Sequence, residues 1–248
     1  MPVAHFLKTA ATLSNPINPV DNHLIRLLPE PDRERLLAAC EHVSLHLSGV
    51  VCEHGAPTLY AYFPLAGFLS LVAHTAQNVR LEVGMVGREG MLGAELALGV
   101  TNAPFHALVQ GAGHALRLSA PALTSAIAQS VALQDLLYRY LGVTTAQLAT
   151  SAACLQLHHA TARLARWILM SHDRAETPCF EVTDEFMAYM MGQSPSRTMD
   201  AVQALKDQGL ITLQGIDLHV LNRTGLEAAA CPCYDLGRSN YRHYIDRG

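Results

Sequence analysis

The chain has 248 residues, of which half are apolar and 15% are charged, and its formal net charge is −4. This composition is typical of a folded globular protein and excludes a disordered chain. No apolar run approaches the ~18 residues of a membrane span, and residues 1–25 lack the basic start and apolar stretch of a secretion signal, so we expect a cytoplasmic protein without membrane contact. Acidic residues outnumber basic ones, 21 to 17, so any contact with a polyanion must come from a local patch.

Six cysteines are scattered through the chain, which indicates reduced thiols rather than a disulfide framework. Cys231 and Cys233 are the only close pair, and a single pair lacks the second pair of ligands that a structural zinc site needs. His158 and His159 are adjacent, but no histidine belongs to a complete Cys/His motif. We therefore predict no metal site and no cofactor, with haem or metal sensing as the alternative.

The first part of the chain predicts a loose arm, then a short helix, then strands. Residues 1–21 contain three prolines and little periodicity, whereas leucines between Leu24 and Leu37 recur at helical spacing. Between residues 43 and 118, apolar and polar residues alternate, and frequent Gly and Pro divide this region into pieces of about 4–8 residues. Short antiparallel strands of this kind favour a small sandwich or barrel, which we assign to a domain at 22–129.

After Ser119 the periodicity becomes helical, and residues 131–157 predict one helix of about 40 Å within a segment at 130–157. Residues along it follow alternating spacings of four and three, which is the pattern of a seam shared by two helices. The predicted seam residues are Leu137, Leu141, Thr144, Leu148, Ser151 and Leu155. The pattern thus predicts a homodimer, and the alternative is a helix that packs only on its own sheet.

The pattern of the last region, 158–248, predicts three helices, a hairpin and a final helix. Thr183 suits the start of one helix and Gly192 its end, and Ser194 followed by proline suits the start of a second helix that runs to Gln208. Residues 210–213 and 218–221 then predict a hairpin. Two helices joined by a tight turn and followed by a hairpin match a winged helix-turn-helix.

The second of these helices has one apolar and one polar side. Thr198, Val202 and Leu205 share a stripe that must face the core. Free backbone N–H groups at the N-terminus of a helix bind phosphate. Among side chains, arginine can bind phosphate or guanine, glutamine can bind adenine, and aspartate can accept a hydrogen bond from cytosine. The predicted DNA-binding residues are Gln193, Ser194, Ser196, Arg197, Asp200 and Gln203. The alternative is an ordinary solvated face, because residues 158–248 hold nine basic against eleven acidic residues.

Several motifs resemble the Crp/Fnr superfamily of bacterial transcription regulators. Residues 192–198 (GQSPSRT) and 205–211 (LKDQGLI) resemble its recognition region, residues 82–93 (EVGMVGREGMLG) resemble its β-roll, and residues 154–167 resemble its hinge. The motifs occur in the family's order within about residues 22–235. The resemblance implies an α+β fold with an antiparallel, jelly-roll-like β-roll that senses an effector, a long dimerisation helix and a C-terminal winged helix-turn-helix.

The resemblance also implies a function. We expect a sequence-specific, non-enzymatic regulator that binds a palindromic duplex as a homodimer, with RNA polymerase as a further partner. Two alternatives stay open: a metal-dependent β-barrel enzyme, and an interaction module on the same fold that needs no ligand.

The proposed effector pocket departs from the family pattern. Members that bind cyclic nucleotides have a Gly-Glu pair and a later Arg followed by Ser or Thr. Here one residue separates Gly93 from Glu95, and Phe105 and His106 stand in place of the later pair. Because no cation remains for the cyclic phosphate, we expect weak or absent cyclic-nucleotide binding and an unknown small molecule as any effector.

Overall fold

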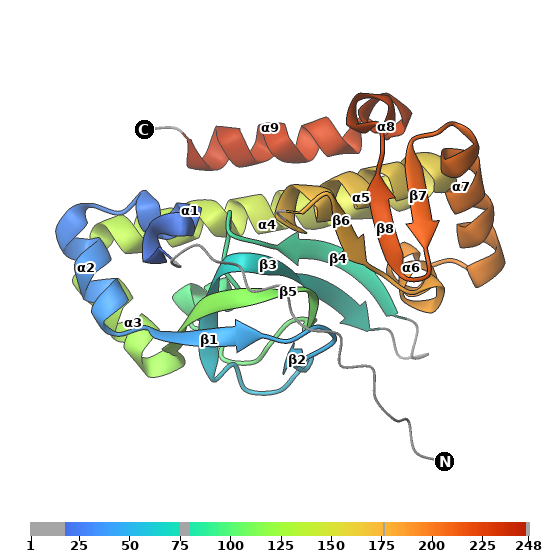
Figure 1. Cartoon of the computed structure of the whole chain (residues 1–248). Coiled ribbons are helices and arrows are strands. Elements are labelled where there is room, and N and C mark those ends of the chain that lie inside the picture. The colour runs from blue at the N-terminus through green and yellow to red at the C-terminus, as the bar shows by residue number, and fades with distance from the viewer. Residues whose placement is uncertain (1–17, 75–79, 176, 247–248) are drawn as a thin grey trace, which may run out of the picture.

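The computed structural model describes residues 18–74, 80–175 and 177–246. Figure 1 shows a bent antiparallel sheet, a long helix across it and a small helical domain at one end. This arrangement confirms the predicted α+β fold. None of the helices in the described part of the chain combines the length and apolar character that crossing a bilayer requires.

The described chain begins with three short helical segments. They are η1 (Pro19–Asp21), α1 (His23–Arg26) and α2 (Glu30–Ala38). The pattern predicted one helix, but Pro29 starts a second. The buried Asn22 side chain donates to the carbonyl oxygens of Pro64 at 3.0 Å and Gly90 at 2.9 Å, which holds this segment on the sheet. Most of the predicted arm, residues 1–17, lies outside the described residues.

The β-roll sheet has the strand order β1-β5-β3-β4, and β2 also pairs with β5. Its strands are β1 (Glu41–Leu45), β2 (Val50–Cys52), β3 (Tyr60–His74), β4 (Arg80–Val86) and β5 (His106–Ser119). The prediction of short pieces was wrong for β3 and β5, which continue through their glycines with shifts in register. A Cβ atom at Gly67 would lie 2.3 Å from the Gly111 oxygen, and one at Gly113 would lie 2.1 Å from the Ala66 oxygen. These glycines therefore permit a close, bulged crossing of two long strands instead of ending them.

The long helix matches its prediction. After η2 (Ala94–Leu98) and α3 (Ala120–Gln129), α4 spans Val131–Leu157, and the Ser130 side chain caps it by accepting from the Leu133 N–H at 3.0 Å. Its first half packs into the β-roll core, where Leu133, Leu136 and Tyr140 are buried. The first half of α4 is therefore part of the β-roll core.

In the described residues, the C-terminal domain contains four helices, α5 to α8, and a small sheet in the order β6-β8-β7 before the last helix of the chain. The elements are α5 (Ala160–Ala175), β6 (Cys179–Glu181), α6 (Asp184–Met191), α7 (Pro195–Asp207), β7 (Ile211–Gln214), β8 (Asp217–Val220) and α8 (Arg223–Ala229). The predicted hairpin is confirmed, with each strand displaced by one residue from its predicted bounds. The strand β6 was not predicted, because three residues are too few to show a period.

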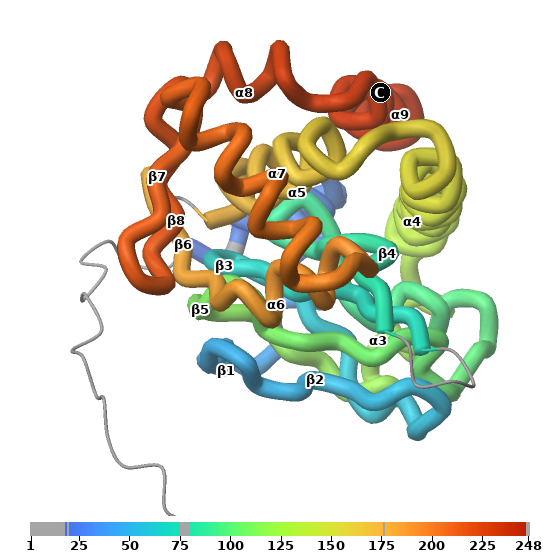
Figure 2. Tube along the Cα trace, turned by 90° about the vertical axis from the view of Figure 1, so that its right-hand side faces the viewer, coloured from blue at the N-terminus to red at the C-terminus, as the bar shows by residue number. Residues whose placement is uncertain are grey.

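The last helix, α9 (Cys233–Ile245), begins against the winged domain, where Tyr234 hydrogen-bonds Asp173 and Arg223, and then leads away from it along α4. Figures 1 and 2 show α9 beside α4 and antiparallel to it. Ile245 is buried in the β-roll core, and Arg139 donates to its carbonyl oxygen at 3.3 Å. The predicted domain at 158–248 therefore joins two structural parts: a winged domain that ends with α8, and a helix that packs on α4.

One apolar core joins the β-roll to the winged domain. Phe68, Val72 and Met85 of the sheet belong to the same buried cluster as Trp167 of α5 and Met187 of α6. Burial at this junction fixes how the two domains sit on each other.

Candidate functional site

The helix-turn-helix is built by local capping. The Thr183 hydroxyl accepts from the Phe186 N–H at 3.1 Å at the start of α6, and Gly192, at φ +60°, ends it. Ser194 then caps α7 by accepting from the Arg197 N–H at 3.4 Å. The predicted starts and stops of both helices are confirmed, and they leave a tight turn between α6 and α7.

The two sides of α7 meet different surroundings. Thr198, Val202 and Leu205 are at most 1% exposed, which confirms the predicted inward stripe. Five of the six predicted DNA-binding residues are exposed: Ser194, Ser196, Arg197, Asp200 and Gln203. Gln193 is half-buried, and its Oε1 atom has no hydrogen-bond partner among the described residues. The polar edge of α7 is therefore free to meet a partner, and its contact with DNA stays a prediction.

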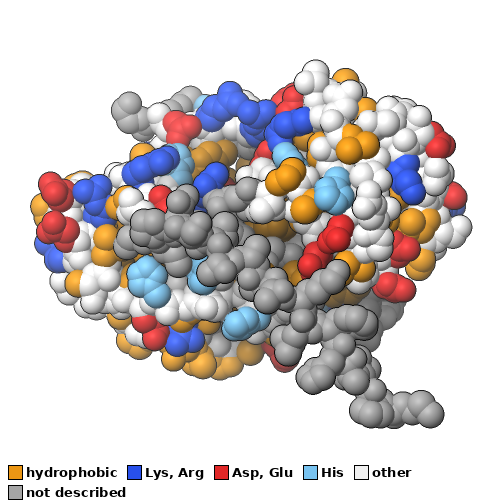
Figure 3. Space-filling view, viewed as in Figure 1, with side chains coloured by type: hydrophobic (Ala, Val, Ile, Leu, Met, Phe, Trp, Pro, Cys, Tyr) orange, Lys and Arg blue, Asp and Glu red, His pale blue; other side chains and the backbone are white. Residues whose placement is uncertain are grey.

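Charge on this edge is sparse. Arg197 and Lys206 are the cations of α7, and the Gln203 amide donates to Asp207 at 2.6 Å. Figure 3 shows Lys and Arg side chains gathered over α9 on the visible face, with only isolated ones near α7. Contact with a polyanion through α7 thus depends on few groups, chiefly Arg197 and the helix N-terminus.

Three of the four predicted effector residues lie at a cavity of about 200 Å³ between the β-roll and α4. Gly93, Glu95 and Phe105 line it, and no Lys, Arg or His of the described chain does. Burial raises the pKa of Glu95, and the Thr58 hydroxyl donates to its carboxyl at 3.3 Å. His106 does not line this cavity; its ring lies 5.2 Å from that of His74, and its pKa is lowered mainly by burial. The cavity is therefore suited to an uncharged ligand.

A second cavity, of about 390 Å³, lies between α4, α5 and α9. Its walls carry the cations that the first cavity lacks: Arg88, Arg166, Arg174, Arg238 and Arg242. Acidic groups of Glu89, Asp173 and Asp246 share the wall. The two cavities thus differ in charge, and the one at the position expected for an effector is the apolar one.

The predicted dimer seam is partly covered by its own protomer, because Leu137 and Ser151 are buried and the other four residues are half-buried. Leu137 is 0% exposed in the β-roll core, so its assignment to a seam was wrong: the sheet already covers it. Three further seam residues, Leu141, Thr144 and Leu148, line the apolar cavity. Ser151 and Leu155 line a small cavity of about 40 Å³ between α4, α5, α6 and β4.

A row of exposed residues on the second half of α4 follows the same alternation of four and three, one position later. The row consists of Thr145, Ala149, Ala152 and Gln156, and the end of the helix beside it is exposed as well. The side chains of the row are small or polar, which allows the close approach of another helix. The surface of α4 that is open to a partner is therefore centred on this row.

Polar contacts tie the β-roll to α5 and α9. Arg174 donates through Nε and Nη2 to one Glu89 carboxylate oxygen at 2.8 and 2.6 Å, and the Tyr241 hydroxyl donates to the Glu89 carbonyl oxygen at 2.6 Å. Glu89, in the 82–93 motif, therefore connects the β-roll to α5 and α9.

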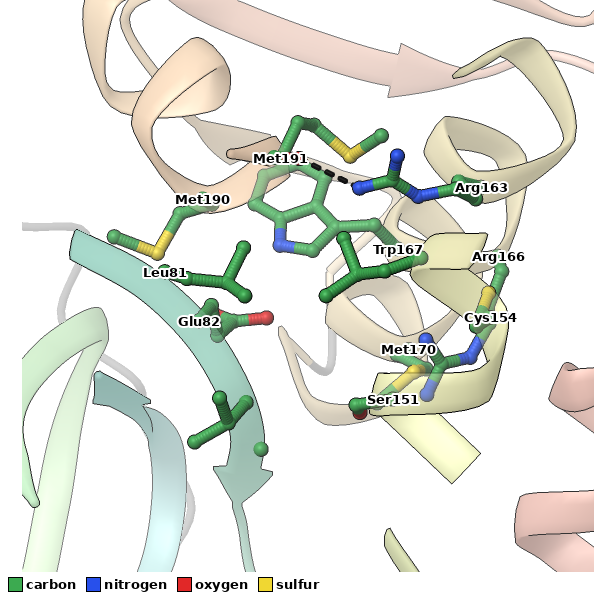
Figure 4. Close-up of a pocket in the computed structure, with 13 residues that line it drawn as sticks. Leu81, Glu82, Ser151, Cys154, Arg163, Arg166, Trp167, Met170, Met190 and Met191 are labelled. Carbon is green, nitrogen blue, oxygen red and sulfur yellow. Dashed lines mark hydrogen bonds between the residues drawn. The ribbon is translucent and has the colours of Figure 1, made fainter. Parts of the chain in front are cut away.

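A further acidic residue, the half-buried Glu82, lies in the same region. Figure 4 shows Glu82 pointing from β4 into the space beside α4 and α5. The Ser70 hydroxyl donates to it at 2.5 Å. Burial raises the pKa of Glu82 to about 7, against the opposing effects of Ser70, Arg166 and Arg174.

The structure also gathers four potential metal ligands that the sequence analysis did not connect. Cys154, His158, Cys231 and Cys233 place one ligand atom each within 4.8 Å of one another. The hydrogen bond between the Cys231 and Cys154 thiols lowers the pKa of Cys154 and raises that of Cys231. The i, i+4 spacing of Cys154 and His158 at a helix end, together with the Cys231/Cys233 pair, was the available signal.

Comparisons with known proteins agree with this geometry. Residues 162–229 match the Crp-like helix-turn-helix domain, a span from α5 to the end of α8. No curated protein matches the chain in sequence.

Solved structures match over most of the chain. FixK2 from Bradyrhizobium japonicum has a TM-score of 0.66 at 15% identity and covers 77% of this chain and 98% of its own. A putative Crp/Fnr transcriptional regulator from Eubacterium rectale has a TM-score of 0.64 at 11% identity, covering 84% and 98%. TTHB099, a CRP-family regulator from Thermus thermophilus, has a TM-score of 0.62 at 18% identity, covering 77% and 96%. The chain therefore has the fold of the Crp/Fnr regulators and carries a Crp-like helix-turn-helix domain at residues 162–229.

Proposed function

We propose that the protein is a sequence-specific, DNA-binding transcription regulator that acts as a homodimer and places α7 in the major groove. The exposed polar edge of α7 carries this proposal. Ser194, Ser196 and Arg197 lie at the N-terminal end of the helix, where free backbone N–H groups favour phosphate. The apolar side of the same helix is buried, so the polar edge points outward.

Dimerisation supplies the contacts that one weakly charged domain lacks. A palindromic site needs two recognition helices ~34 Å apart, and the long α4 suits a dimer axis between two such domains. The pairing surface is the exposed row Thr145, Ala149, Ala152 and Gln156. A signal that changes how these rows pair would change the spacing of the two α7 helices.

The signal is a small uncharged molecule in the apolar cavity between Glu95, Phe105 and α4. Two observations support this assignment: no cation of the described chain lines the cavity, and α4 contributes Leu141, Thr144 and Leu148 to its wall. A cyclic phosphate there would lose its hydration without a charged partner in return. A ligand in this cavity touches the helix that leads to the hinge.

The alternative of a metal-dependent β-barrel enzyme would need ligands inside the β-roll. Among the described residues, the group of His and Cys able to hold an ion lies at the hinge instead. This placement favours the regulator, with no catalytic step.

The test is selection of bound duplexes from a random library by the full-length protein, followed by titration of the selected duplex. We expect a palindromic sequence, and Arg197→Ala should weaken binding by about 1–3 kcal/mol. If Arg197 contacts phosphate, the slope of log affinity against log salt concentration should also fall by about one in magnitude in the variant. If Arg197 contacts guanine, the preference for that base at one position of the duplex should weaken.

Arg26→Ala is the matched control, because Arg26 is an exposed arginine on α1, at the opposite end of the molecule from α7 (Figure 1). It removes the same charge and should leave the affinity unchanged. Failure to enrich any duplex, or equal effects of the two variants, would refute the proposal.

A further inference from the structure

We propose that Cys154, His158, Cys231 and Cys233 bind one Zn²⁺ ion, which ties the C-terminal helix α9 to the hinge between α4 and α5. This site goes beyond the proposed function, because DNA binding through α7 does not require it. The ligands come from the last turn of α4, the α4–α5 hinge and the segment that opens α9.

The separations of the ligand atoms fit a single ion. The Sγ atoms of Cys154 and Cys231 are 3.4 Å apart, and the Cys233 Sγ lies 3.7 Å from His158 Nδ1. Tetrahedral zinc with bonds of about 2.3 Å to sulfur and 2.0 Å to nitrogen separates its ligand atoms by about 3.5–3.8 Å. Because all four atoms lie within 4.8 Å of one another, they are too close to surround a cluster of several irons, which spreads its thiolates farther.

The donor set matches structural zinc. Three thiols and one imidazole form a Cys₃His set, one of the usual sets for a closed four-coordinate site. All three cysteines are free and buried, and His158 is half-buried. Since the protein supplies all four ligands, no position stays open for substrate, and the expected role is structural.

Backbone hydrogen bonds hold the ligands in place. The His158 N–H donates to the Cys154 carbonyl oxygen at 3.2 Å, which keeps these two residues one turn apart. The Cys231 N–H donates to the Ala162 oxygen at 3.2 Å, and the Tyr234 N–H donates to the Cys231 oxygen at 3.1 Å. Backbone contacts that do not involve the thiols thus fix the α8–α9 connection against α5. Because these segments are already ordered, binding of the ion costs less conformational entropy.

The surroundings also suit the charge of the complex. Three thiolates and one Zn²⁺ ion carry a net charge of −1, which requires a nearby cation in a buried place. Arg166 lines one cavity wall with Cys154, as Figure 4 shows, and a second wall with Cys233. Its Nε atom is buried and has no hydrogen-bond partner among the described residues. A negatively charged metal complex would stabilise this guanidinium.

The experiment measures metal content in the full-length protein, purified with a reductant and without chelator. We expect one zinc per chain by elemental mass spectrometry. Replacement of zinc by Co²⁺ should give thiolate-to-cobalt charge-transfer bands and the d–d bands of a tetrahedral site. Cys154→Ser and Cys233→Ser should each lower zinc retention about tenfold or more under the same dialysis.

Cys179→Ser is the matched control, because Cys179 is a half-buried cysteine of β6 outside the cluster; it should keep one zinc per chain. Circular dichroism shows whether each variant folds, and the Co²⁺ spectrum of the unmodified protein tests the site even if a variant does not. The proposal is overturned if the reduced protein binds neither zinc nor Co²⁺ through thiolate. It is also overturned by an iron–sulfur spectrum, by a Cys154–Cys231 disulfide in place of metal, or by full zinc retention in both cluster variants.

Discussion

The two halves of α4 share one continuous helix but differ in what surrounds them. In residues 131–143, Leu133, Leu136, Leu137 and Tyr140 are at most 5% exposed and pack into the β-roll. In residues 144–157, one side lines cavities and the other presents an open row of small and polar side chains. The first half is therefore held by the β-roll core, whereas the second half is where the apolar cavity, the proposed pairing surface and the α4–α5 connection come together.

This difference has a mechanical consequence. Moving the first half would expose apolar surface, at about 25 cal/mol per Å². Moving the second half disturbs cavity walls and a smaller buried cluster of Cys154, Ala162, Cys231 and Cys233. The proposed ligand in the apolar cavity would therefore act more easily on the second half, which leads to the α4–α5 connection and the winged domain.

The largest change in the free energy of unfolding should come from a substitution in the first half of α4. Leu137→Ala removes a side chain that is 0% exposed, and the resulting cavity should lower the free energy of unfolding by about 2–5 kcal/mol. Thr145→Ala, on the exposed row of the other half, should change it by less than about 1 kcal/mol. Urea unfolding followed by circular dichroism measures both. Similar losses for the two variants would show that the halves do not differ as described.

The next prediction concerns how stability depends on pH through the carboxyl group of Glu82, which lies beside the second half of α4. The pKa of Glu82 is raised by burial to about 7 from its ordinary value of 4.5. Its contribution to stability is therefore fully present below about pH 4.5, decreases as the pH rises, and is lost once the pH passes about 7. Glu82→Gln removes this titration, so the stability of the variant relative to the unmodified protein should rise by about 2–3 kcal/mol between pH 5 and pH 8.

Unfolding in urea at a series of pH values tests this prediction. Glu34→Gln is the control, because Glu34 is exposed on α2, and its stability relative to the unmodified protein should stay constant with pH. A Glu82→Gln difference that is equally constant would show that the Glu82 carboxyl is ionised throughout.

The sequence predicted the features that depend on neighbours along the chain. The bounds of α4, the caps Thr183 and Ser194, and the buried stripe of α7 follow from local hydrogen bonds and helical period, and the structure confirms them. The extent of β3 was not predictable in this way, because a glycine that ends a strand and one that permits a strand crossing look the same until the partner strand is known.

Contacts between segments far apart in the chain were also not predictable from the sequence, as Leu137 and the Cys/His cluster show. A seam pattern shows that one side of a helix is buried, but it does not show what buries it; for Leu137 the answer is the protomer's own sheet. The four proposed metal ligands include Cys154 and Cys231, which are 77 positions apart, and the packing of α9 on α4 brings them together. Gln193 is half-buried at the turn between α6 and α7, and its predicted contact with DNA stays a prediction.

The smallest predicted effect is on the stability of the proposed dimer, and it tests the exposed row on the second half of α4. Ala152→Glu places a charge in the middle of this row, and two copies facing each other across a dimer axis would repel and keep water at the contact. We expect the dimer to weaken about tenfold, equivalent to about 1.4 kcal/mol, in sedimentation equilibrium. Affinity for the selected duplex should fall in parallel, because dissociated chains present only one α7. Ala128→Glu makes the same change on an exposed position of α3 and should alter neither. If Ala128→Glu dissociates the protein and Ala152→Glu does not, the second half of α4 is not the pairing surface, and its exposed row must instead face solvent.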